Sequence, residues 1–263
     1  MPGNRELIHA YGVMDPSADV PDWPPGVVDA PVEVTAFDQV VAMTSALPAD
    51  EFEPAAWERH ADDASWLGSV AAGHHRVLQA AIAAGDVVPF RLPSLYGDHE
   101  ALRRALSDHA GSIAEAMERV RGRVEWAVKL YRSDESGEPD TDSESARTGS
   151  DYLIGRSRQM QARAEADALV EDRVRSLYDR LRETSVAAVR NPPQDRLLSG
   201  RSEPMVLNAA FLVERTGLAD CQARIDEVAQ QARSFSLLTE ASGPWPAYNF
   251  ASLASADTVA GPA

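Results

Sequence analysis

Cysteine, lysine and long apolar runs are nearly absent from this sequence. The 263 residues contain one cysteine, Cys221, which excludes an internal disulfide and indicates a cytoplasmic protein. The only lysine is Lys129. No apolar run approaches the roughly 18 residues that a membrane-spanning helix needs, and the first residues lack the apolar stretch of a signal peptide. We therefore expect no membrane span and no secretion signal.

Basic residues are also scarce relative to acidic ones. The chain carries 25 Lys and Arg against 41 Asp and Glu, a formal net charge of −16. Residues 1–121 hold 8 basic and 19 acidic residues, so most of the excess negative charge lies in the first half. Because phosphate contacts require a basic face, nucleic acid is not an expected partner. The acidic balance favours solubility and opposes self-association.

Motifs for nucleotide binding and nucleophilic catalysis are absent as well. The sequence contains no G-x-G-x-x-G, G-x-x-x-x-G-K-[ST] or G-x-S-x-G pattern. His74 and His75 are adjacent, but neighbouring helical side chains point about 100° apart and cannot chelate a metal as an i, i+4 pair can. We predict that His74 is a hydrogen-bonded core residue. No catalytic, cofactor-binding or metal-binding residue is assigned, and no cofactor is expected.

Glu125 is the residue whose surroundings leave two interpretations open. It lies beside Trp126 in an alternating, strand-like run, Val124–Tyr131. Lys129 follows four residues later on the same face of a strand, so an ion pair is the favoured interpretation. The alternative is a buried acid or base with a shifted pKa.

The order of the expected elements predicts an α+β protein with two domains. We expect an N-terminal α+β domain over residues 1–122, a modified ferredoxin-like arrangement, and a C-terminal domain over 123–263. The clearest element is a helix from Trp66 to Ile82, whose apolar residues recur at helical spacing. The other N-terminal elements expected are strands at 7–13, 32–37, 40–44 and 86–92 and helices at 54–61 and 98–120.

The C-terminal domain is expected to follow the ferredoxin-like order β-α-β-β-α-β. Its long helix begins near Ser150 and is expected to end at Asn191-Pro192-Pro193, because proline cannot continue a helix. The remaining elements expected are strands at 124–131, 196–199, 205–213 and 235–238 and a helix at 218–233.

Two segments of this domain stand out by composition. Residues 132–148 are acidic, have no apolar anchor and are predicted to form a flexible, dispensable loop. Residues 243–250 place three aromatic residues and two prolines within eight positions. Their aromatic bulk predicts that this ending packs against the C-terminal domain, and its prolines exclude a central strand.

Several local signatures occur in a fixed order along the chain. They are His74–Leu78, Val88–Arg91, Val124–Tyr131, Tyr152-Leu153, Leu207–Val213 and Gly243–Phe250, with His74, Glu125, Trp126, Lys129, Asn208, Trp245 and Tyr248 as structural motif residues. Their order and spacing over about residues 7–250 resemble the gas vesicle protein GvpL/GvpF family. Two features depart from the family pattern: Arg91 is followed by Leu92-Pro93 instead of an aromatic residue and glycine, and the acidic insert is longer.

The resemblance implies a cytoplasmic, gas-vesicle-associated accessory or minor structural protein that is not an enzyme. It implies binding to the hydrophobic major shell protein, and contact with other gas vesicle accessory proteins, in a chaperone-like role in nucleation and assembly. Pro89 suggests an accessible or bulged strand edge, so Pro89, Arg91 and Tyr96 are the expected partner-binding residues. The alternative function is a cytoplasmic enzyme with a polar interdomain cleft around Glu125 and His74.

Overall fold

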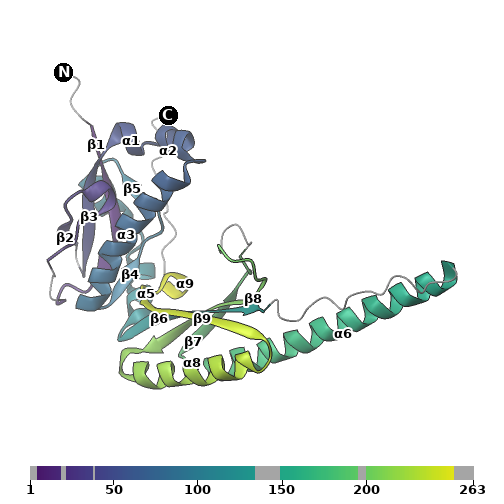
Figure 1. Ribbon diagram of the computed structural model, residues 1–263. Coiled ribbons are helices and arrows are strands. Elements are labelled where there is room, and N and C mark those ends of the chain that lie inside the picture. Colours follow the sequence, from purple (N-terminus) through teal and green to yellow (C-terminus); the bar gives the residue numbers. More distant parts are fainter. Residues whose placement is uncertain (1–4, 19–21, 38, 134–148, 195–199, 252–263) are drawn as a thin grey trace. The chain divides into compact units, whose positions relative to one another are not determined.

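The computed structural model describes residues 5–18, 22–37, 39–133, 149–194 and 200–251 (Figure 1). The chain divides into two compact units. Residues 1–125 and 244–263 form the first unit, and residues 126–243 form the second. The division at 125/126 lies close to the expected boundary, but the C-terminal ending is assigned to the first unit instead of the second.

The first unit is built on an antiparallel sheet whose central strands are buried. The strand order is β2-β3-β1-β4, and β5 also pairs with β1. The predicted hairpin is confirmed, since Phe37 pairs with Val40 where β2 meets β3. The strands are β1 (Glu6–Met14), β2 (Glu33–Phe37), β3 (Val40–Pro48), β4 (Val87–Pro89) and β5 (Leu95–Tyr96).

One long helix, α3 (Ala64–Ala84), supplies much of the first core and confirms the predicted helix. The Asp63 side chain caps its start by accepting hydrogen bonds from the backbone of Ser65 and Trp66, and Gly85 ends it. The other helical elements of this unit are η1 (Val27–Asp29), α1 (Ala49–Phe52), α2 (Pro54–His60), α4 (His99–Asp108), α5 (Ala110–Val120) and α9 (Tyr248–Ala251).

The single helix expected over 98–120 is in fact two. Asp98 caps α4 as predicted, through a 2.7 Å bond from the Ala101 amide. The break falls at His109, whose backbone leaves the helical region at φ −107° and ψ 13°. The His109 ring lies 2.9 Å from the Ala105 carbonyl oxygen, and its backbone amide also donates to that oxygen, so the residue that follows α4 caps its C-terminal end.

Gly73 has no side chain, so α3 approaches η1 more closely than it could with any other residue at this position. A Cβ atom at Gly73 would lie 2.7 Å from the Gly26 carbonyl oxygen and 2.8 Å from the Val27 Cα. We expect Gly73→Ala to lower the free energy of unfolding by about 1–3 kcal/mol, because backbone must move. Gly68, on the same helix, has nothing within 4 Å, so Gly68→Ala should instead stabilise by about 0.5–1 kcal/mol. Urea denaturation of both variants tests this, and equal effects would contradict the close approach.

The second unit packs two helices on a sheet with the strand order β7-β8-β6-β9. Its core lies between the sheet and the two helices. Val128 of β6 and Phe211 of β8 pack there with Leu177 of α6 and Ile225 of α8. The elements are β6 (Arg123–Arg132), α6 (Gly149–Arg182), β7 (Ala187–Asn191), β8 (Met205–Glu214), η2 (Arg215–Gly217), α8 (Leu218–Arg233) and β9 (Leu237–Trp245).

The expected element order β-α-β-β-α-β is present, but three positions differ from the prediction. The helix α6 ends at Arg182 instead of continuing toward Asn191, and residues 187–191 form β7. The strand expected at 196–199 lies outside the described residues, as does most of the acidic loop at 132–148. The last strand reaches Trp245, and its place at an edge of the sheet accommodates Pro244.

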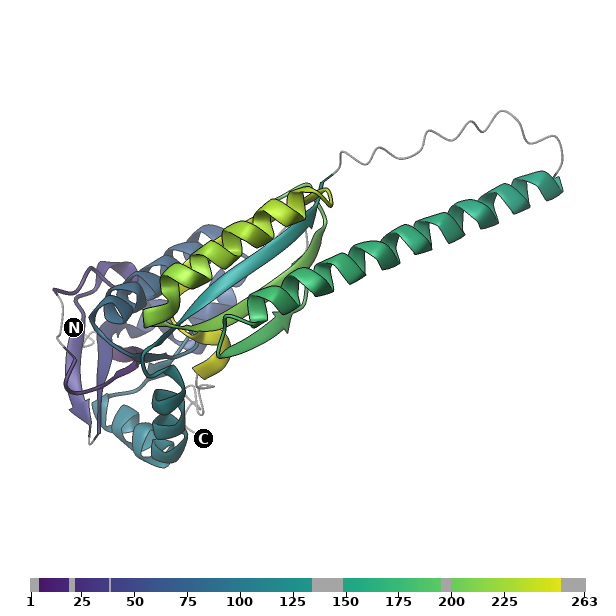
Figure 2. The ribbon, with the colours of Figure 1, turned by 90° about the horizontal axis from the view of Figure 1, so that it is seen from below.

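The first half of α6 extends past the strands of its own sheet (Figure 2). Residues 155–169 are exposed, and Met160 keeps 66% of its surface in solvent. The last turns pack on the core, through Val174, Leu177 and Leu181. Within the described residues, no helix is long and apolar enough to cross a membrane.

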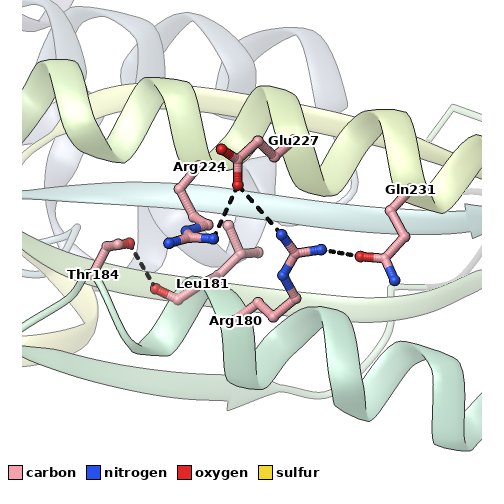
Figure 3. A network of polar contacts seen from close by, with 6 residues as sticks. All are labelled: Arg180, Leu181, Thr184, Arg224, Glu227 and Gln231. Carbon is pink, nitrogen blue, oxygen red and sulfur yellow. Dashed lines mark hydrogen bonds and ion pairs between the residues drawn. The ribbon is translucent and has the colours of Figure 1, made fainter.

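Polar contacts join the packed end of α6 to α8 (Figure 3). Glu227 accepts hydrogen bonds from Arg180 at 3.3 Å and from Arg224 at 2.9 Å, and Arg180 also bonds the Gln231 amide oxygen. The Glu227 side chain is 56% exposed, so this network orients the two helices while contributing little net stability.

Candidate functional site

The aromatic ending and α3 meet at a cluster centred on His75. The His75 ring lies 4.8 Å from the Trp245 ring, centroid to centroid, and its Nδ1 lies 3.4 Å from the Tyr248 hydroxyl. The Gln79 side-chain amide is 3.2 Å from the His75 Nε2 and donates to the Pro244 carbonyl oxygen at 3.2 Å. This arrangement requires a neutral His75 whose Nε2 accepts and whose Nδ1 carries the proton. Burial lowers the pKa of His75, which favours that neutral form.

A second anchor joins Glu125 to Asn249. Glu125 is 3% exposed, and its two carboxylate oxygens accept from the Asn249 backbone amide at 2.8 Å and the Asn249 side-chain amide at 2.6 Å. The expected pair with Lys129 is therefore wrong, since the Lys129 ammonium donates to the Gln194 side chain at 3.2 Å. Burial raises the pKa of Glu125 to about 7, against the opposing effect of the two Asn249 hydrogen bonds.

The last helix, α9, completes the attachment of the ending to the first unit. Ala247 and Ala251 are buried, and α9 contacts α5 and β4. The Arg119 guanidinium donates to the Phe250 carbonyl oxygen at 3.0 Å. The ending is therefore part of the fold, but the expectation that it packs against the C-terminal domain is wrong, because these contacts are all with the first unit.

His74 belongs to a separate, fully enclosed polar network in the same unit. Its Nδ1 lies 3.0 Å from the His9 Nε2, which confirms the predicted hydrogen-bonded core histidine. Tyr11 stacks on the His74 ring at 5.5 Å and accepts a hydrogen bond from the Val27 amide at 3.0 Å. The Tyr11 hydroxyl donates to the Ser45 hydroxyl at 2.8 Å, since Ser45 in turn donates to the Pro31 carbonyl oxygen.

Both core histidines are uncharged at neutral pH. Burial lowers the pKa of His74 to about 4. Burial also places the pKa of His9 well below its ordinary value, and repulsion from His74 lowers it further. A neutral, enclosed pair of this kind organises a core, and it offers no group that can reach a substrate.

The residues expected to bind a partner are not all accessible. Pro89 and Tyr96 are buried, while Arg91 is exposed. The strand β4 does stand at an edge of its sheet, but α5 and α9 pack against it. The accessible edge expected at Pro89 is therefore closed. Partner binding by Arg91 stays a prediction.

The remaining motif residues lie in the second unit and serve its packing. Trp126 packs against the second core, and the Asn208 side chain donates to the Pro192 carbonyl oxygen at 3.0 Å. Sequence analysis missed the anchoring roles of Gln79 and Asn249, although Asn249 stands inside the aromatic ending. In the part of the chain that the structure describes, no group of three or more His, Cys, Asp or Glu residues could hold a metal ion.

The mixed α+β fold with two sheets also occurs in gas vesicle proteins of known structure. The crystal structure of GvpF from Anabaena sp. PCC7120 matches with a TM-score of 0.69 and 17% identity, over 95% of this chain and 97% of that one. GvpF from Microcystis aeruginosa matches with a TM-score of 0.65 and 17% identity, over 95% of this chain and 100% of that one. At this identity the likeness shows the fold alone.

Sequence comparison then identifies the family. The family model described as gas vesicle synthesis protein GvpL/GvpF matches residues 7–252. Gas vesicle protein L from Streptomyces sp. strain CB03234 is 32% identical over 260 residues, which cover 95% of this chain and 95% of that protein. The chain belongs to the GvpL/GvpF family, which supports a role in gas vesicles.

Proposed function

We propose that this chain binds the hydrophobic major shell protein and assists gas vesicle nucleation and assembly, as a cytoplasmic accessory or minor structural protein. The observation that carries the proposal is the family match across residues 7–252. A hollow shell requires subunits with a large apolar face, and such a face aggregates in water. An acidic partner that covers this face until the subunit joins the shell acts like a chaperone. Other gas vesicle accessory proteins are further proposed partners.

The site supports binding better than catalysis. Both oxygens of Glu125 are occupied by Asn249, and His74 is enclosed beside His9. The alternative function, catalysis by an enzyme, requires that Glu125 and His74 meet in one polar cleft. Each of them instead holds a different part of the first unit together. We therefore propose a role that depends on surfaces, with these residues maintaining the fold.

We also infer finer features of the fold from the order of its strands. The second unit has the element order β6-α6-β7-β8-α8-β9 and the strand order β7-β8-β6-β9. This is the order of a ferredoxin-like split βαβ domain, in which the first and third strands are central. We propose that the unit folds as such a domain, with α6 as its lengthened first helix.

Direct binding is tested by co-expressing the full chain with the major shell protein and measuring the shell protein that co-purifies. The full chain is required, because a fragment of residues 1–121 lacks both Glu125 and the ending that packs on the first unit. We expect a complex that survives a rise in salt to about 1 M, since salt screens exposed charge pairs but not apolar contact.

The shell protein expressed alone provides the background for this measurement. A complex that dissociates in salt would show that charge pairs dominate and would contradict apolar recognition. No complex at any salt concentration would remove the chaperone role.

A further inference from the structure

A cavity of about 610 Å³ lies in the first unit, apart from the anchors of the ending. It opens between the β2–β3 hairpin, α4 and α5. Cavities of this size are typical of binding sites. Its apolar wall is formed by Phe37, Leu106, Ile113 and Met117.

Small side chains line the α5 side of this cavity, which we call the groove. Ala110 and Ala114 line it one helical turn apart, and both are exposed. A helix offers ridges of side chains at this same spacing, and small residues let two helix backbones come close. The groove therefore suits the apolar face of a helix better than it suits an extended strand.

Two arginines line the groove within an acidic half of the chain. Arg103 and Arg121 are two of the 8 basic residues in residues 1–121, which also contain 19 acidic residues. The Arg103 guanidinium lies 5.1 Å from the centre of the Phe37 ring, at the edge of the apolar wall. Asp15 also lines the groove, and Glu100 and Glu118 pair with the two arginines, so the arginines offer positive charge to a partner only where its carboxylate displaces these pairs.

Both arginines are free to exchange their present ion-pair partners. Arg103 pairs with Glu100 at 3.6 Å within α4, and Arg121, the residue that follows α5, pairs with Glu118 at 3.0 Å. The arginine side chains are 54% and 65% exposed, so these pairs contribute little and a carboxylate of a partner can replace them. Complementarity thus favours an acidic, amphipathic partner.

We propose that this groove binds one amphipathic helix of the major shell protein. The apolar face of that helix packs on Phe37, Ile113 and Met117, and a carboxylate at its border bonds Arg103 or Arg121. This inference rests on the proposed function, which supplies the identity of the partner. It moves the docking surface from the closed strand edge at Pro89 to α4 and α5 of the same unit.

Matched variants of the full chain test the groove against its surroundings. Ala114→Glu places a carboxylate and extra volume in the groove, and Ser112→Glu places the same group on an exposed position of α5 outside it. Arg121→Glu reverses the charge at the rim, and Arg104→Glu does so on α4 outside the groove. We expect about a tenfold loss of co-purified shell protein for Ala114→Glu, about a threefold loss at low salt for Arg121→Glu, and less than a twofold change for the controls.

Photo-crosslinking reports contact without relying on loss of binding. A benzophenone side chain at position 114 of the full chain should crosslink to the co-expressed shell protein, and one at position 112 should not. Urea denaturation of each variant shows whether its fold is intact, because these positions are exposed and should leave the unfolding midpoint unchanged.

The outcomes separate the groove from the proposed function. If the unaltered chain binds the shell protein and both groove variants bind equally well, the groove is not the docking surface and the proposed function stands. If the position-114 crosslink captures a second copy of this chain instead, the proposed partner is wrong. If the unaltered chain captures no shell protein, the proposed function and this inference fail together.

Discussion

A chain that ends after Gly243 is expected to lose about 3–5 kcal/mol of unfolding free energy in its first unit. The deletion removes both hydrogen-bond donors to the buried Glu125 carboxylate. It also removes the Trp245 ring from His75 and uncovers the surfaces that Ala247 and Ala251 bury. Urea denaturation measures the loss, and amide hydrogen exchange should show faster opening in α5 and β4, which α9 contacts.

A shorter truncation and a point variant serve as controls for this deletion. A chain that ends after Ala251 keeps every contact named above, so its difference from the Gly243 truncation isolates the contribution of residues 244–251. Asn249→Ala removes one of the two donors to Glu125 and should cost about 1–2 kcal/mol. If the Gly243 truncation unfolded at the unaltered midpoint, the ending would not be part of the fold.

The elements with strong local signals could be predicted from the sequence. The periodic apolar face of α3, its Asp63 cap and its stop at Gly85 depend on residues within one or two helical turns. The β2–β3 hairpin likewise depends on neighbours in sequence. Such features are encoded locally, so periodicity and capping chemistry reveal them.

The end of α6 shows where local signals were weak. Ala, Val and Arg in residues 187–190 are compatible with helix or strand, and the prolines at 192 and 193 suggested a later stop. The helix instead ends where two side chains take up its last carbonyl groups. The Thr184 hydroxyl donates a hydrogen bond to the Leu181 carbonyl oxygen, and the Ser185 hydroxyl donates one to the Arg182 carbonyl oxygen. Serine and threonine compete with helical hydrogen bonding in this way.

The errors at the site concern contacts between distant parts of the chain. Glu125 was paired with the nearest cation, whereas its partner Asn249 lies 124 residues away. Pro89 correctly marked a sheet edge, but α5 and α9, which cover that edge, are separate helices. Both Glu125 and the ending could nevertheless be identified as motifs from the sequence, because the same residues carry the family resemblance.

Replacing Glu125 by glutamine is expected to change how the stability of the first unit depends on pH. Burial raises the pKa of Glu125 from an ordinary 4.5 to about 7 in the folded chain. The folded state therefore binds this proton more tightly than the unfolded state does. The carboxyl group stabilises the fold when protonated, and that contribution is lost as pH rises from 4.5 through 7.

The difference between Glu125→Gln and the unaltered chain isolates this effect. Glutamine has no titrating group, so the variant should gain stability relative to the unaltered chain as pH rises, by about 1.4 kcal/mol per pH unit and about 3 kcal/mol in all. The lowered pKa values of His9 and His74 make both proteins less stable as pH falls below 6.5, with the opposite sign. This contribution is common to both proteins and cancels in the difference.

The measurement is a urea titration at several pH values from 4.5 to 7.5, repeated for Glu115→Gln as the control. Glu115 is exposed on α5, so its replacement should leave the difference from the unaltered chain nearly constant across this range. A Glu125→Gln difference that is equally constant would mean that the carboxylate is ionised throughout. In that case the Asn249 hydrogen bonds, which favour the charged form, would outweigh the cost of burying Glu125.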